Sequence, residues 1–446
     1  MKTSIASRVE RLPICGFHRR LVSLVSVGTW FEFFDLFMMA YLGPALQAIH
    51  FLTLQQFSQV IAAGFLGMFV GTIVLGVGSD YFGRRDVFII MLLVYSICSL
   101  AGAFSPSVGV LLLMRFLAGI GIGGQQVIVD TYVSEMVPSR VRGRYVAISQ
   151  TVSFTAVPAV ALLSRLLVAT HWLLPGWRWV MLIGGSGALV APFIMRGIPE
   201  SPRWLESRGR EPEAEAIMAV IEAEVEQETG RLLPAPQPLA VEVTGGMPFR
   251  ELWLPHYRGR TFMLIVFQLL QTIGFCGFAN WAPTFLLAQG RNLGQSLKFG
   301  FLITLVSPVG PLIGVFTAER FERKYTLVVL SLLIAAAGLT FAFASHPITI
   351  VLIGSLTTIF SYWFSSVFHA YQAELFPTRA RATGVGLTYS ASRLSAATSS
   401  LIIGALLVHG VPAVFIFIAA AMIGVALVVG IAGPRTNGAA LEEISG

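Results

Sequence analysis

A few ionisable side chains lie within long apolar stretches of this 446-residue sequence. Glu32 and Asp35 stand three residues apart, a spacing that places both carboxylates on one face of a helix. Arg115 and Arg393 occupy two other apolar stretches. A charge in hydrocarbon costs at least ~2.5 kcal/mol, so each of these groups should be paired, face water or serve a function. Such carboxylates can carry protons, and such guanidinium groups can hold a carboxylate by two hydrogen bonds.

The elements that carry these groups are predicted to be membrane-spanning helices. Apolar residues make up 55% of the chain and charged residues 12%, which is more hydrocarbon than a water-soluble fold can cover. A span needs roughly 20 mostly apolar residues. We predict an all-α membrane protein with twelve spans, at residues 21–49, 59–79, 87–104, 108–129, 145–169, 177–195, 262–288, 297–316, 326–344, 348–371, 383–408 and 411–431.

The basic residues set the predicted orientation. Lys and Arg gather before the first span and then in alternate loops, while the intervening loops have few or none. By the positive-inside tendency both termini and the long central loop are cytoplasmic, in a protein of the cell's inner membrane. The same placement argues against a nucleic-acid partner despite the net charge of +7. Three scattered cysteines indicate neither a disulfide framework nor a metal site.

The two halves of the chain share one register. The stretch YVSEMVPSRVR around Glu135 returns 239 residues later as YQAELFPTRAR around Glu374, and the same shift places Arg84 on Arg323. We therefore predict two parallel six-helix repeats, at residues 1–196 and 261–446, which rock around a central site. Residues 197–260 read as a cytoplasmic linker with a helical centre at 211–229. Because the halves bury one another's helices, a monomer suffices.

A short loop between the second and third spans reads GVGSDYFGRR, at residues 76–85. Its glycines allow close packing and a sharp turn, and Asp80 can cap a helix end or pair with a nearby Arg. This loop, RFLAGIGIGGQ at 115–125, the Glu135 stretch and PESPRWL at 199–205 resemble the major facilitator superfamily. Within it they look like the sugar porters and the aromatic-acid and metabolite proton symporters. The likeness covers nearly the whole chain and implies a secondary active transporter, not an enzyme.

In that superfamily the loop is a gate latch, and the resemblance implies the same role here. Topology and loop stability alone are the alternative explanation. Glycines two to four residues apart on the fourth span let helices approach closely in lipid, which needs no substrate. The predicted gating residues are Gly76, Asp80, Gly83, Arg84, Arg85, Glu135, Arg142, Glu319, Arg323, Glu374 and Arg381.

Asp35 and Arg115 match the positions at which proton-coupled sugar porters carry a proton-sensitive pair. A carboxylate whose pKa depends on the distance of its Arg partner can load a proton on one side of the membrane and release it on the other. The resemblance thus implies proton coupling through Asp35 and Arg115, with Glu32 as a secondary proton site and no cofactor besides the proton. A static ion pair between the first and fourth spans is the alternative.

Arg393 lies near the middle of the eleventh span, and no acidic residue follows it before Glu442. Its counter-charge must come from another helix or from a ligand. In related organic-anion carriers an Arg on this span holds the substrate, so the resemblance implies that Arg393 binds a carboxylate. The alternatives are pairing with Asp35, Glu32 or Asp130, and snorkelling to the membrane surface.

Polar and aromatic side chains near these charges would shape a pocket. The seventh span lacks the usual sugar-porter motif, and NWAPTFL at 280–286 instead resembles the aromatic-acid symporters, so a sugar is the weaker candidate. His369 can titrate near neutrality but lies near the cytoplasmic end of its span, and it ranks below Asp35. The predicted substrate-binding residues are Arg393, Gln271, Asn280, Trp281, Trp363, Gln150 and Tyr389.

These features together predict proton-coupled symport of a small organic anion, an aromatic or other monocarboxylate, across the lipid bilayer. A proton-coupled carrier of a sugar, polyol or drug is the alternative of the same class. A non-transporting ligand sensor on the same fold is the alternative of another class. No His-Glu-x-x-His zinc motif, Gly-x-Ser-x-Gly elbow or Walker loop occurs that would indicate hydrolysis or ATP-driven pumping.

Overall fold

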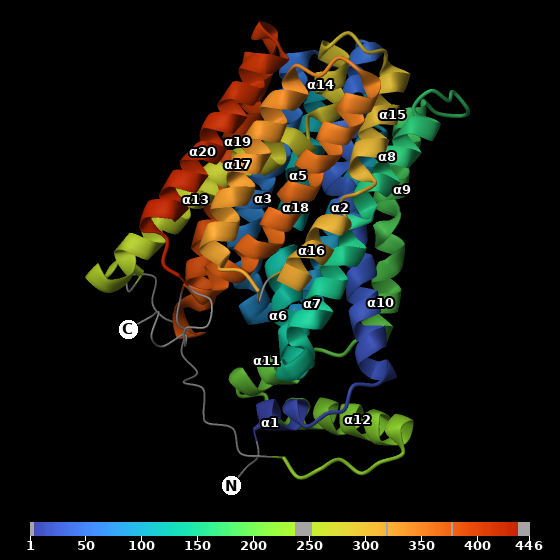
Figure 1. The fold of residues 1–446 in the computed structure, drawn as a ribbon. Coiled ribbons are helices and arrows are strands. Elements are labelled where there is room, and N and C mark those ends of the chain that lie inside the picture. Colours follow the sequence, from blue (N-terminus) through green and yellow to red (C-terminus); the bar gives the residue numbers. More distant parts are fainter. Residues whose placement is uncertain (1–3, 237–251, 318–319, 376–377, 436–446) are drawn as a thin grey trace.

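The computed structural model describes residues 4–236, 252–317, 320–375 and 378–435, which form a bundle of long helices (Figure 1). Twelve helical stretches of this described part are long and apolar enough to cross a membrane. They are Gly16–Ala48, Leu54–Phe82, Arg84–Ala103, Val108–Met136, Ser139–Leu167, Gly176–Gly197, Tyr257–Ala279, Leu293–Gly314, Arg323–Ala342, Pro347–Gln372, Gly384–His409 and Val411–Ala432. The predicted all-α class with twelve spans is confirmed, and the division at residues 196 and 260 stays a prediction.

Several spans consist of more than one helix. The first half and the linker contain α1 (Ile5–Glu10), α2 (Gly16–Ala48), α3 (Leu54–Phe82), α4 (Arg84–Ala103), α5 (Val108–Gly123), α6 (Gln125–Met136), α7 (Ser139–Phe154), α8 (Ala156–Leu167), α9 (Gly176–Gly185), α10 (Ala191–Gly197), α11 (Pro202–Ser207) and α12 (Glu211–Thr229). The second half contains α13 (Pro255–Ala279), α14 (Ala282–Ala288), α15 (Leu293–Thr304), α16 (Val309–Thr317), α17 (Arg323–Ala342), α18 (Pro347–Glu374), α19 (Thr378–Leu406) and α20 (Val411–Ala432). The linker helix lies where the sequence predicts it.

Prolines account for three of the breaks within predicted spans. A proline lacks an amide hydrogen and clashes with the carbonyl group four residues earlier. In each case the first helix ends four residues before the proline: α7 before Pro158, α13 before Pro283 and α15 before Pro308. At the first break the Ser307 hydroxyl, from the other half, donates to the Phe154 carbonyl oxygen over 3.3 Å. The breaks therefore free backbone groups that join the two halves.

Glycines bring α3 and α5 into backbone contact, which fixes the position of Arg115 on α5. A Cβ added at Gly67 would lie 2.0 Å from the Phe116 carbonyl oxygen, and one at Gly119 would lie 2.1 Å from the Gly64 carbonyl oxygen. Only residues without side chains allow this approach, and such close packing drives helix association in lipid. The close approach predicted for the fourth span is confirmed.

The two halves meet at the end of the bundle where α2 ends and α3 begins. The Tyr41 hydroxyl donates to Thr304 Oγ1 over 3.4 Å. A Cβ added at Gly404 would lie 2.6 Å from Ser58 Cβ, so α19 packs directly on α3. These contacts join the first and second halves at that end of the molecule.

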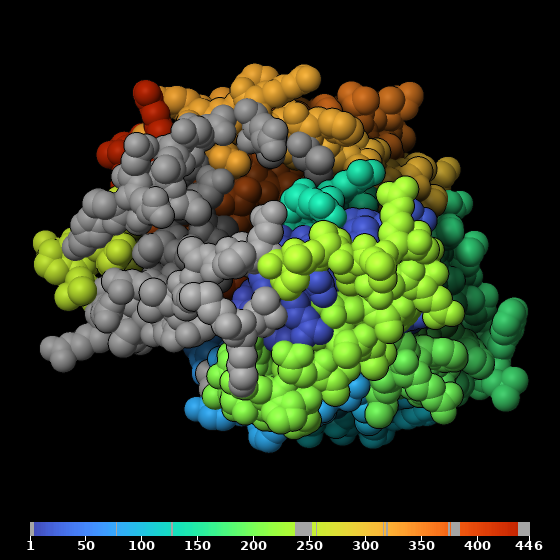
Figure 2. Space-filling view, turned by 90° about the horizontal axis from the view of Figure 1, so that it is seen from below, coloured from blue at the N-terminus to red at the C-terminus, as the bar shows by residue number. Residues whose placement is uncertain are grey.

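At the opposite end, which we call the linker end, α1, α11 and α12 lie beneath the bundle (Figure 1). Figure 2 shows residues of α12 beside the N-terminal residues on this face. The buried apolar residues of α12 recur every three or four positions, and the Arg8 and Arg11 side chains donate to Glu222 over 2.7 and 2.6 Å. The helical part of the linker is therefore docked on the N-terminal segment.

Candidate functional site

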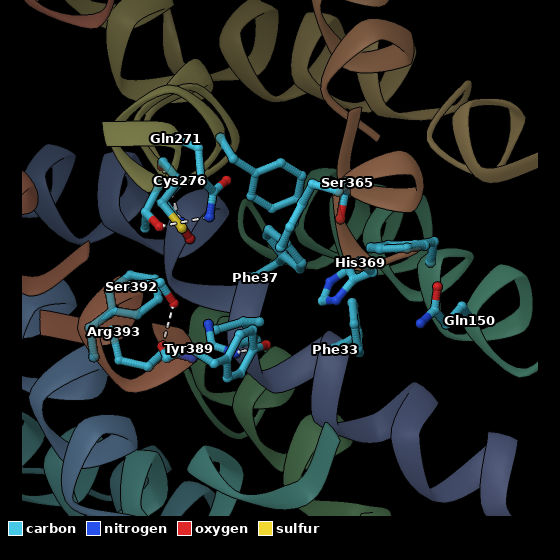
Figure 3. A pocket seen from close by; sticks show the side chains of 17 residues that line it. Phe33, Phe37, Gln150, Gln271, Cys276, Ser365, His369, Tyr389, Ser392 and Arg393 are labelled. Carbon is cyan, nitrogen blue, oxygen red and sulfur yellow. Dashed lines mark hydrogen bonds between the residues drawn. The ribbon is translucent and has the colours of Figure 1, made fainter. Parts of the chain in front are cut away.

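A cavity lies between the two halves (Figure 3). Six of its seventeen lining residues are phenylalanines, and the polar ones come mainly from α13, α18 and α19. Such a wall suits a flat apolar ligand with a few polar substituents. The lining residues are Phe33, Leu36, Phe37, Phe65, Gln150, Phe154, Gln271, Thr272, Phe275, Cys276, Asn280, Ser365, Phe368, His369, Tyr389, Ser392 and Arg393.

Arg393 supplies the positive charge of this cavity wall. Its guanidinium group donates to the Tyr389 hydroxyl, and its Cζ lies 4.5 Å from the centre of the Tyr389 ring. The Ser395 hydroxyl donates to the Leu269 carbonyl oxygen over 2.5 Å, which ties α19 to α13 beside the cavity. Among the described residues the Arg393 Nε–H has no acceptor. The cation is therefore held by neutral groups and retains donor capacity for a ligand.

Acidic groups lie near Arg393 without touching it. Glu32 is only 3% exposed, and its Oε2 has no hydrogen-bond partner among the described residues. Glu32 is within electrostatic reach of Arg393, Asp130 and Asp35, although no ion pair joins the described side chains of Glu32 and Arg393. Asp35 is paired elsewhere. Among the described side chains, therefore, neither Glu32 nor Asp35 forms an ion pair with Arg393.

Asp35 and Arg115 form a buried ion pair that also includes Ser99. Arg115 donates to both carboxylate oxygens of Asp35, over 3.0 Å from Nη1 and 3.2 Å from Nη2. The Ser99 hydroxyl donates to Asp35 Oδ1 and accepts from Arg115 Nη2 over 2.5 Å. The side chains of Asp35 and Arg115 are 0% and 5% exposed. The structure thus brings the predicted partners together and adds a third group between them.

A second cavity places this pair next to the central one. Asp35 and Arg115 line the second cavity. Leu36, Phe65 and Asn280 line both. A change at the ion pair can therefore reach the central cavity through a wall one side chain thick.

Two predicted substrate-binding residues lie away from the cavity wall. Trp281 is 0% exposed and packs on Phe57 of the first half, with ring centres 5.0 Å apart. The Trp363 indole N–H donates to Thr317 Oγ1 over 2.9 Å. Trp281 follows the break after α13, which turns its ring into the contact between the halves. The predicted role of both in the pocket wall is not met, whereas the wall does contain Gln150, Gln271, Asn280, Tyr389 and Arg393.

Sequence reasoning missed Ser99. Serines are common in these spans, and only the packing of α4 on α2 and α5 distinguishes Ser99. His369, which ranks below Asp35 on sequence grounds because it lies near the cytoplasmic end of its span, lines the cavity. The sequence did contain one indication of the phenylalanine wall, because Phe33 and Phe37 are four residues apart and therefore lie on one face of α2.

The loop between α3 and α4 requires a glycine at Gly83. Its φ is +106°, and a Cβ there would lie 2.2 Å from Glu200 Oε2. Glu200 accepts from the first two backbone amides of α4 over 3.0 and 3.1 Å, where the helix dipole favours a carboxylate. Arg84 pairs with Asp80 over 2.7 Å, as predicted, and lies 3.6 Å from Glu135. The motif residues therefore form one charged cluster at the linker end.

The other predicted gating residues have separate partners or lie outside the described part of the structure. Arg85 pairs with its neighbour Asp86 over 2.8 Å, and Arg142 lies 3.6 Å from Glu10 of α1. Among the described atoms none lies within 4 Å of a Cβ added at Gly76, but a Cβ added at Gly124 would lie 3.4 Å from the Gly76 amide nitrogen, so the two backbones approach closely there. Of the second-half residues, Arg323 begins α17, while Glu319 and the side chains of Glu374 and Arg381 lie outside what the structure describes.

Comparisons with known proteins agree with this architecture. A family model described as sugar (and other) transporter matches residues 23–446. The putative metabolite transport protein YyaJ of Bacillus subtilis is 34% identical over 98% of this chain and 96% of its own length. The niacin transporter NiaP of Acinetobacter baylyi is 30% identical over 99% of both chains.

A solved structure shares the fold. The xylose transporter XylE from E. coli, in a partially occluded inward open conformation, matches with a TM-score of 0.77 and 18% identity over 95% of this chain and 100% of that chain. The chain belongs to the sugar (and other) transporter family of the major facilitator superfamily. It is a membrane transporter, and the relatives it matches are transporters, not enzymes.

Proposed function

We propose that this transporter couples proton entry to symport of a small organic anion, an aromatic or other monocarboxylate. The observation that carries the proposal is Arg393, a cation in the cavity wall whose only described hydrogen-bond partner is the neutral Tyr389 hydroxyl. A guanidinium group holds a carboxylate by two hydrogen bonds, and this pairing is strongest away from water. Niacin, which gives the Acinetobacter relative its name, is an aromatic monocarboxylate.

The phenylalanine wall favours an aromatic ring behind that carboxylate. Phe33 and Phe154 pack edge to face with ring centres 4.9 Å apart, and Phe275 of α13 lines the same cavity. Aromatic pairs add roughly 0.5–1.5 kcal/mol beyond the area they bury. Gln150, Gln271 and Asn280 would bond the ring's substituents.

The proton would travel on Asp35, with Arg115 as its partner and Glu32 as a secondary site. A proton on Asp35 removes the charge that holds Arg115, and loss of that proton restores the pair. The charged clusters around Asp80 and Arg84, and their second-half counterparts, would latch the linker end during alternating access. We place the linker end and both termini in the cytoplasm and propose that a monomer in the inner membrane is sufficient.

Uptake driven by a pH gradient in proteoliposomes tests the proposal, with aromatic acids, aliphatic acids, sugars and organic cations as candidate substrates. We expect saturable acid uptake that falls at least about 30-fold in kcat/KM for Arg393→Ala, because truncating one partner of a buried charge pair costs ~2 kcal/mol or more. Arg165→Ala, which removes an exposed arginine of α8, is the matched control.

Two outcomes would replace the proposal. Uptake of a sugar, polyol or drug that survives Arg393→Ala would establish the alternative carrier. Saturable ligand binding without flux, measured on the same purified protein, would establish a sensor.

A further inference from the structure

A chain of side-chain amides runs from the cavity wall to His369. Gln271 Nε2 donates to Gln268 Oε1 over 2.8 Å, and Gln268 Nε2 donates to Gln372 Oε1 over 2.8 Å. Gln372 Nε2 then lies 3.2 Å from His369 Nδ1. The chain crosses from α13 to α18, and all three amides are at most 6% exposed.

Thr272 favours one direction for the whole chain. Its hydroxyl donates to the Gln268 carbonyl oxygen over 2.7 Å, so this single proton is already used. The Thr272 oxygen can then only accept from Gln271, whose Nε2 lies 3.0 Å away. Reversing every amide would require the one hydroxyl proton to make two bonds, so the reversed chain has one hydrogen bond fewer.

This direction determines where His369 carries its proton. A neutral imidazole has one donor and one acceptor nitrogen, and the hydrogen bond at one nitrogen fixes the role of the other. Because Gln372 donates to Nδ1, the proton of His369 is on Nε2. The ring is stacked on Phe368, with centres 4.2 Å apart, and projects into the open part of the pocket (Figure 3). Among the described residues Nε2 has no hydrogen-bond partner, so it offers the cavity a donor.

The His369 ring and the Arg393 guanidinium group both lie near Tyr389. The Tyr389 ring centre lies 6.2 Å from the His369 ring centre and 4.5 Å from Arg393 Cζ. A single-ring acid whose carboxylate is on Arg393 therefore has its ring edge near His369. A neutral donor at that edge suits a neutral acceptor, because a second carboxylate would call for a second cation.

We propose that His369 is a specificity-determining residue that donates from Nε2 to an acceptor atom on the substrate's ring. The preferred substrate class is then an aromatic monocarboxylate with a ring lone pair, such as a pyridine carboxylate, over a benzoate of the same shape. The inference rests on the proposed function, because Arg393 is taken to hold the carboxylate. Thr272 and Gln372 act as positioning residues that set the tautomer.

The first test compares uptake of pyridine-3-carboxylate and benzoate in proteoliposomes. A site that donates a hydrogen bond rejects an analogue lacking the acceptor, so we expect a kcat/KM ratio of at least about tenfold in favour of the pyridine acid. His369→Leu should bring the ratio close to one while benzoate is still transported. Gln372→Leu and Thr272→Val should lower it partway, since they release the tautomer.

Thr358→Val is the matched control, because this buried hydroxyl bonds only the carbonyl oxygen of Gly354 on its own helix among the described residues. It should leave the ratio unchanged. An unaltered ratio in His369→Leu, with both acids transported, would overturn the proposal. Failure of the wild type to transport either acid, while another monocarboxylate is taken up, would overturn the inferred substrate class, and failure to transport any acid of the panel would instead refute the proposed function.

A second test reads the tautomer without transport. The difference between ¹⁵N-histidine NMR spectra of the wild type and His369→Leu isolates the His369 signals. We expect an unprotonated Nδ1 and a protonated Nε2, with a mixture of tautomers in Thr272→Val but not in Thr358→Val. A wild-type spectrum with the proton on Nδ1 would refute the direction of the amide chain whatever the substrate is.

Discussion

Asp35 and Arg115 form either a proton-coupling pair or a purely structural ion pair. Removing both charges in one double variant distinguishes these two roles. The two side chains are 0% and 5% exposed, and their charges bond each other and Ser99. Taking one charge from such a pair leaves the other buried without compensation, at a cost of about 3–5 kcal/mol. We expect Asp35→Asn and Arg115→Gln each to lose stability on this scale.

The double variant should behave differently. Replacing a buried ion pair by hydrophobic residues of similar volume is often nearly free of cost, and the Asn and Gln amides, although polar, can hydrogen-bond each other where the charges were. Most of the lost stability should therefore return, which corresponds to a coupling energy of about 3 kcal/mol or more between the two sites. Neutralising Arg210 and Glu213, an exposed pair 2.6 Å apart, is the control and should show no coupling of this size.

Thermal unfolding in detergent measures the stability of the wild type, the two single variants, the double variant and the control variants, and proteoliposomes measure their transport. On the proposed mechanism the double variant exchanges substrate across the membrane but no longer accumulates it when a pH gradient is imposed. Accumulation at the wild-type level by a stable double variant would refute proton transfer at Asp35 and leave a static pair. Single variants as stable as the wild type would refute the energetic reasoning itself.

Two further predictions concern the linker end. Gly83→Ala should lower the free energy of unfolding by about 1–3 kcal/mol or more, because the φ of Gly83 is +106° and the new Cβ would meet Glu200. Gly143→Ala should be tolerated, because no described atom lies near a Cβ added there. Unfolding temperatures measure both effects. Burial raises the pKa of Glu222, but hydrogen bonds from two N-terminal arginines outweigh it and hold that pKa below 4.5. The docking of α12 should therefore be intact above about pH 4.5 and weaken as the pH falls through the lowered pKa. Glu222→Gln should reduce this pH dependence. Hydrogen exchange of α12, corrected for intrinsic rates, measures the strength of docking at each pH.

The spans and the linker helix could be predicted because they depend on local patterns. Hydrocarbon content sets the twelve spans, and residues 211–229 show the helical spacing that α12 has. The pairing of Asp35 with Arg115 could also be predicted, but through a family resemblance, since nothing local relates positions 80 residues apart.

Contacts made across helices could not be predicted in this way. Apolar content predicts one span around Trp281, yet Pro283 breaks the helix and turns that ring into the contact between the halves. The orientation of a side chain around its helix decides whether Trp363 or His369 meets the cavity, and a uniformly apolar span has little amphipathic pattern to reveal it. The amide chain from Gln271 to Gln372 depends on the packing of α13 and α18.

The arrangement of charges also suggests why anion and proton would move together. Glu32 connects the proposed anion site with the proposed proton site, because it is within electrostatic reach of both Arg393 and Asp35. An anion held at Arg393 cancels a positive charge that stabilises ionised carboxylates nearby, so anion binding and proton binding reinforce each other. Linkage makes this effect reciprocal, because the factor by which the anion strengthens proton binding equals the factor by which the proton strengthens anion binding. Symport would then follow because Glu32 interacts electrostatically with both sites. It needs no rigid connection between the two cavities.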